Sequence, residues 1–86
     1  MEVKLEKKSG RYVVYERGLL HSYRSVLRDG IAYGESDDPA EAMGLLDGVL
    51  AFGLSGFVYD TERDAVRDPL RSEGWVDVAI LNWTVG

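Results

Sequence analysis

The sequence predicts an α+β fold: an antiparallel β-meander sheet of five to six strands, with one α-helix, at about residues 38–52, packed on one face. Three observations support it. Several short segments are rich in β-branched and aromatic residues, turn residues separate them, and a continuous apolar stripe at helical spacing follows residue 38. The 86 residues are long enough for one modest core, so residues 1–86 are expected to form a single domain.

The first part of the chain predicts strands. Val3 and Leu5 alternate with charged residues in the segment 2–6, and Ser9-Gly10 supplies turn chemistry. The returning strand is expected over 11–16, where Tyr and Val dominate.

Residues 19–28 are ambiguous. Their apolar residues fall at helical spacing, whereas Asp29-Gly30, followed by Ile-Ala-Tyr, is a strong hairpin signal. We favour a strand, which makes residues 2–35 a four-stranded meander, and the helical alternative stays open.

The long helix has clear boundaries. Ser36-Asp37-Asp38-Pro39 offers a cap followed by proline near the first helical position, and Gly53 is a natural stop. Strands are expected over 57–60 and 75–83, with a mainly exposed loop over 61–74. The predicted core consists of Val3, Leu5, Val14, Leu27, Ile31, Met43, Leu46, Val49, Leu50, Phe57, Val76, Val78 and Ile80.

The composition limits the classes of function and the cellular location that we expect. Without cysteine there are no disulfides and no thiolate chemistry, which fits a cytoplasmic location, and neither a signal peptide nor a membrane span is expected. The net charge is −5, but residues 1–28 carry a net +4 and residues 29–62 a net −8 without one Lys or Arg. Either the two parts neutralise each other, or the acidic part forms a face that attracts a basic partner.

The second reading predicts a partner-binding surface for a protein with a basic surface. Its residues, gathered around the start of the helix and beyond it, are Glu35, Asp37, Asp38, Glu41, Asp47, Asp60 and Glu62.

No catalytic motif is present, so an enzyme is not expected, and no cofactor or metal is predicted. His21 is the only histidine and has no Ser-His-Asp arrangement or metal spacing beside it. Asp60, Glu62 and Asp64 alternate as in a calcium loop, but Ala65 and Arg71 occupy the positions that need Gly and Glu.

Two other parts of the chain are candidate surfaces. Gly44 and Gly48 lie opposite the apolar stripe, which predicts either close approach of another backbone, as in a homodimer, or a small exposed face. Arg11, Arg24 and Arg28 with Tyr12 or Tyr23 would suit a basic sheet face that binds nucleic acid. The acidic total opposes direct binding of nucleic acid.

The layout from Tyr15-Glu-Arg-Gly18, through Asp29-Gly30, to Gly34-Glu-Ser-Asp-Asp-Pro-Ala-Glu-Ala42 resembles small phage-encoded anti-CRISPR proteins. That resemblance implies an inhibitor whose acidic patch occupies the DNA-binding surface of a CRISPR effector. The stretch from Gly34-Glu-Ser to Glu41-Ala42 is also similar to HicB-like antitoxin domains, which implies, as the alternative, a module that neutralises a small toxin.

Overall fold

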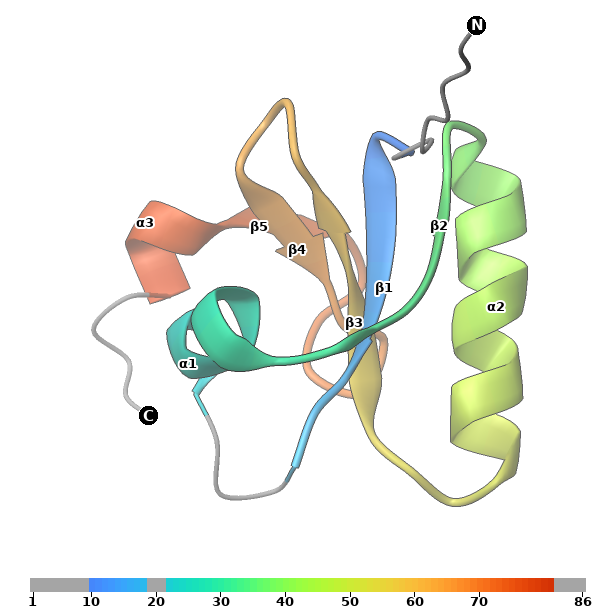
Figure 1. The fold of residues 1–86 in the computed structure, drawn as a ribbon. Coiled ribbons are helices and arrows are strands. Elements are labelled where there is room, and N and C mark those ends of the chain that lie inside the picture. Colours follow the sequence, from blue (N-terminus) through green and yellow to red (C-terminus); the bar gives the residue numbers. More distant parts are fainter. Residues whose placement is uncertain (1–9, 19–21, 82–86) are drawn as a thin grey trace, which may run out of the picture.

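A computed structural model describes residues 10–18 and 22–81 (Figure 1). The described elements, in chain order, are β1 (Tyr12–Glu16), α1 (Tyr23–Asp29), β2 (Ala32–Ser36), α2 (Pro39–Ala51), β3 (Gly56–Asp60), β4 (Ala65–Arg67), β5 (Trp75–Asp77) and α3 (Val78–Leu81). The strands form one antiparallel sheet in the order β2-β1-β3-β4-β5. The predicted α+β class, the five-stranded antiparallel sheet and the long helix are confirmed.

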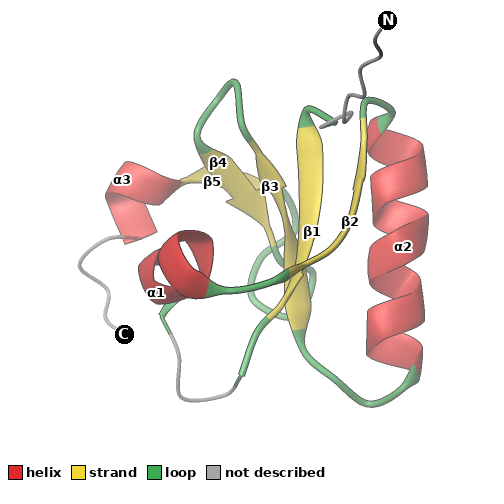
Figure 2. Cartoon of the chain, viewed as in Figure 1, coloured by secondary structure: helices red, strands yellow, loops and turns green. Residues whose placement is uncertain are grey.

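The sheet lies between helices. α2 packs on one face, and α1 and α3 lie on the other (Figure 2). Because successive strand residues point to opposite faces, Val58 joins the core beneath α2, whereas its neighbour Phe57 joins the core beneath α1. Two small cores therefore share a single sheet.

The boundaries of α2 follow from its local sequence. Asp38 is the N-cap, and its side chain accepts a hydrogen bond from the Ala40 N–H at 3.0 Å; Pro39 then opens the helix. Leu46 and Val49 are fully buried against the sheet, which stabilises the fold by about 1.5–3 kcal/mol for each side chain. After the helix, Gly53 adopts a positive φ of 83°.

The interpretation of residues 19–28 as a strand is wrong, because Tyr23–Asp29 form α1. Ser22 caps this helix by accepting a hydrogen bond from the Ser25 N–H at 3.1 Å. Asp29-Gly30 is not a hairpin turn, because Gly30 is the C-cap and has an extended conformation with φ −74°. The continuous meander over 2–35 is therefore corrected as well, and residues 1–9 and 19–21 lie outside the described residues.

The C-terminal part also differs from the prediction. The segment expected to be a loop contains the short strand β4, and the predicted last strand ends at Asp77, where α3 begins. The backbone N–H of Val78 donates to the Asp64 carbonyl at 2.9 Å, which continues the β4–β5 pairing up to the first residue of α3.

The predicted core is largely confirmed. Among its described members, Ile31 and Ile80 were wrong, since they are 86% and 53% exposed. Ile31 stands between the end of α1 and the start of β2, and Ile80 falls in α3 instead of a strand. Val3 and Leu5 lie outside the described residues.

A candidate acidic interaction surface

Four of the predicted site residues gather where β2 passes into α2. The side chains of Glu35, Asp37, Asp38 and Glu41 are exposed, and with Gly10 and Ser36 these residues line a surface depression of about 480 Å³. We call these four carboxylates the acidic surface. The sequence brings them together because a strand end, a two-residue connection and the first turn of a helix are consecutive.

Each carboxylate is oriented by a neutral donor. Glu35 accepts a hydrogen bond from the Gly10 N–H and Asp37 accepts one from the Arg11 N–H, both at 2.8 Å. Since a carboxylate has two oxygens and several lone pairs, these bonds orient the groups without consuming their capacity to accept more.

Ser36 organises the other end of the depression. Its hydroxyl donates to Glu41 Oε1 and accepts a hydrogen bond from the Asp38 N–H at 3.0 Å. Ser36 itself is only 8% exposed, so the hydroxyl is fixed from within the fold. The carboxylate of Glu41 is thereby directed by a buried partner.

The acidic surface carries four formal negative charges. In the described part of the chain, no Lys or Arg side chain forms an ion pair with any of its four members. The N-terminus of α2 contributes a partial charge of about +0.5, which offsets only a fraction of four formal negative charges. Among the described residues, the lining of the depression therefore carries a net negative charge.

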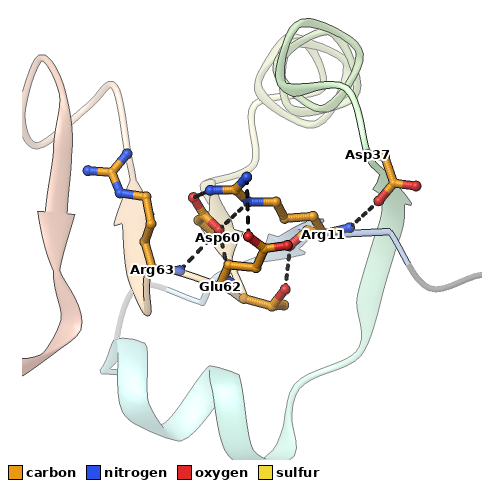
Figure 3. Close-up of polar contacts among 6 residues, drawn as sticks. Arg11, Asp37, Asp60, Glu62 and Arg63 are labelled. Carbon is orange, nitrogen blue, oxygen red and sulfur yellow. Dashed lines mark hydrogen bonds and ion pairs between the residues drawn. The ribbon is translucent and has the colours of Figure 1, made fainter.

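Asp60 does not belong to this surface, which corrects the prediction that it binds a partner. Its side chain is buried and accepts hydrogen bonds from Arg11 Nε at 2.9 Å and Nη2 at 3.0 Å (Figure 3). The backbone N–H groups of Glu62 and Arg63 donate to Asp60 Oδ1 as well. The hydrogen bond from Arg11 holds the pKa of Asp60 below its usual value, and the role of this carboxylate is structural.

Arg11 lies between the acidic surface and the carboxylates of Asp60 and Glu62. Figure 3 shows its backbone N–H directed to Asp37 and its guanidinium group directed to Asp60 and Glu62. Glu62 is 69% exposed and lies 3.4 Å from Arg11 Nη1, so its charge is already paired. Asp47 is exposed on α2 but does not line the depression.

The sequence reasoning did not single out Arg11 and Ser36 as residues that organise the site. Ser36 could have been recognised, because serine just before an acidic helix start commonly bonds to nearby backbone. Arg11 gave no such signal, since its contact with Asp60 spans 49 residues.

The basic sheet face proposed for nucleic-acid binding is not assembled. Arg24 and Arg28 lie on α1 and not on a strand, and Arg28 Nε pairs with Asp29 at 3.3 Å. Arg11 is held by Asp60, as described above. The three arginines therefore do not form one surface.

The small-residue face of α2 is open. A Cβ atom placed on Gly44 or Gly48 would meet no atom within 4 Å outside the helix. Within the described residues 10–18 and 22–81, no other backbone approaches these two glycines closely, and the homodimer stays a prediction.

Other site classes gain no support from the described residues. Among residues 10–18 and 22–81, no group of three or more His, Cys, Asp or Glu side chains is placed to hold a metal ion. The same ranges contain no helix with the length and apolar character that crossing a bilayer requires. His21 lies outside them.

Comparisons of the chain with protein-family models, with curated proteins and with solved structures gave no match.

Proposed function

We propose that this protein is a non-enzymatic interaction module that binds a basic protein surface through Glu35, Asp37, Asp38 and Glu41. In its inhibitory form, the module occupies Lys and Arg side chains that otherwise hold the phosphates of a nucleic acid. The observation that carries the proposal is the gathering of four exposed carboxylates around one depression, without a cationic partner in the described chain.

Electrostatic attraction would raise the rate and the selectivity of this association more than its affinity. An exposed ion pair stabilises by about 0.2–1 kcal/mol, so four pairs contribute about 1–4 kcal/mol. Micromolar affinity needs about 8 kcal/mol. The carboxylates would therefore mainly accelerate encounter and select basic partners, and additional contacts must supply the rest.

The resemblance to phage anti-CRISPR proteins makes the DNA-binding surface of a CRISPR effector the first partner to test. We propose a phage source and a cytoplasmic location together with this partner.

The test compares two neutralised variants with equal net charge. The first carries Glu35→Gln, Asp37→Asn, Asp38→Asn and Glu41→Gln, which keep oxygen acceptors for the local hydrogen bonds. The control neutralises exposed carboxylates elsewhere, through Glu16→Gln, Asp64→Asn, Glu73→Gln and Asp77→Asn. Binding to purified DNA-binding effector subunits, and displacement of their DNA, would be measured for both variants.

We expect the first variant to lose binding and the control to retain it. Wild-type binding should also weaken with rising salt, as the screening length falls from about 10 Å at 0.1 M to about 3 Å at 1 M. Equal binding by the two variants would refute the assignment of this surface.

A further inference from the structure

The two edges of the described sheet are unequal. β5 has three residues and runs directly into α3, whereas β2 has five residues. Across residues 10–18 and 22–81, β2 pairs with β1 on one side and has no strand on the other. β2 contains no Lys or Pro, two of the devices that protect strand edges from pairing.

The side chains of β2 are sorted between its two faces. Gly34 lies toward α2, where an added Cβ would come within 2.9 Å of Leu45, and Ser36 is buried. Glu35 pairs with Val13 and points to the other face, whereas Tyr33, which is 49% exposed, is the extra residue of a β-bulge and has no partner on β1. An extended segment beside β2 would thus meet an exposed aromatic ring and a carboxylate.

The negative charge along β2 indicates which kind of strand can pair with this edge. Glu35 lies on the strand, Asp29 precedes it and Asp37 follows it. A second copy paired in parallel would oppose Glu35 to Glu35, and an antiparallel copy centred on Ser36 would oppose Glu35 of each strand to Asp37 of the other. Like charges across strands destabilise pairing, whereas opposite charges and cation–aromatic contacts stabilise it.

We propose that an extended basic segment of the partner adds to the sheet as a strand alongside β2, with Arg or Lys side chains against Glu35 and the exposed ring of Tyr33. This inference rests on the proposed function, and it supplies the contacts that the exposed carboxylates lack. Main-chain hydrogen bonds give affinity in this mode of recognition, and alternate side chains give specificity.

The test uses a synthetic peptide in which Arg and Val alternate. The control is a peptide of equal charge in which two of the Val residues are replaced by Pro. Both peptides carry the same charge, but proline lacks the N–H that a strand ladder requires. Binding and amide hydrogen exchange of the full chain would be measured by NMR, with the wild type and the Glu35→Gln variant.

We expect the alternating peptide to slow exchange of amides in β2, and the proline peptide to bind about tenfold more weakly, as the loss of one or two hydrogen bonds implies. The Glu35→Gln substitution should weaken binding of the alternating peptide. Equal affinity of both peptides, with no added protection of β2 amides, would overturn strand addition and leave the proposed function standing. Failure of both peptides to perturb either region would count against both.

Two further outcomes would also overturn the inference. Protection of β2 amides that grows with protein concentration without peptide would identify a second copy as the occupant. Protection without peptide at every concentration would show that the chain itself already fills the edge.

Discussion

Replacing Asp60 should cost more stability than replacing any exposed carboxylate. Its side chain is fully buried, and Asp60→Ala removes the acceptor of two Arg11 hydrogen bonds and of two backbone N–H groups. Breaking a buried pair costs about 3–5 kcal/mol. Because the Arg11 side chain stays 32% exposed and water can reach it, we expect the lower end, about 3 kcal/mol.

This loss is large for a domain whose total stability is about 5–15 kcal/mol. With a urea dependence of about 1 kcal/mol per molar, the unfolding midpoint should fall by about 3 M. Asp60→Asn retains one acceptor oxygen and should lose roughly half as much. The matched control is Glu62→Gln at the exposed partner of Arg11, where we expect a change below about 1 kcal/mol.

Acid titration provides a second readout of the same pair. The pKa of Asp60 is lowered in the folded state, so its contribution is present above the unfolded-state pKa and is lost as pH falls through the folded-state value. Asp60→Asn should lack this part of the acid dependence. Equal midpoints for Asp60→Ala and Glu62→Gln would refute a structural role for the buried carboxylate.

Three further predictions concern stability. Tyr23→Phe removes the hydroxyl that donates to buried Asp68 at 2.7 Å and should cost about 1.5–3 kcal/mol in urea unfolding. Burial and this hydrogen bond raise the pKa of Tyr23 from 10.0 to about 12, so its contribution is present below pH 10 and lost as pH rises toward 12, a loss that the variant should lack. Asp38→Ala should cost about 1 kcal/mol by removing the helix cap, whereas Asp38→Asn should be nearly neutral; equal melting temperatures for both would contradict the cap. Gly44→Ala should stabilise by about 0.5–1 kcal/mol, because the added methyl group meets open space; destabilisation would show that another chain packs there.

The features that sequence predicted well are local ones. The cap at Asp38, Pro39 at the first helical position and the apolar spacing of Leu46 and Val49 lie within a few residues of one another. The acidic surface was predictable for the same reason, because Asp38 and Glu41 form the helix cap and part of its first turn, and Asp37 and Glu35 lie within three residues before the cap.

The error at α1 came from two competing local signals. Asp29-Gly30 is typical of a hairpin turn in which glycine takes a positive φ, yet Gly30 is extended here. Glycine fits this position because a Cβ would lie 2.5 Å from the Val26 carbonyl oxygen, a close approach that no pattern in the sequence reveals. Ser22, the observed cap, was the weaker signal.

Features that depend on distant pairing could not be predicted. β4 has three residues, too few for a period, and is defined by its pairing with Tyr59 and other residues of β3. In the sequence, nothing distinguishes Asp60 from the other acidic residues. Its partner Arg11, which directly precedes β1, is 49 residues away in the chain. Sequence therefore located the negative charge but not which carboxylates are already paired.

The most direct test of the proposed function is a binding isotherm for a basic DNA-binding partner, measured at low and high salt with the acidic-surface variant and its equal-charge control. Selective and salt-sensitive loss of binding in the acidic-surface variant is the predicted result. Indistinguishable isotherms for the two variants would contradict it, because net charge alone would then explain the attraction.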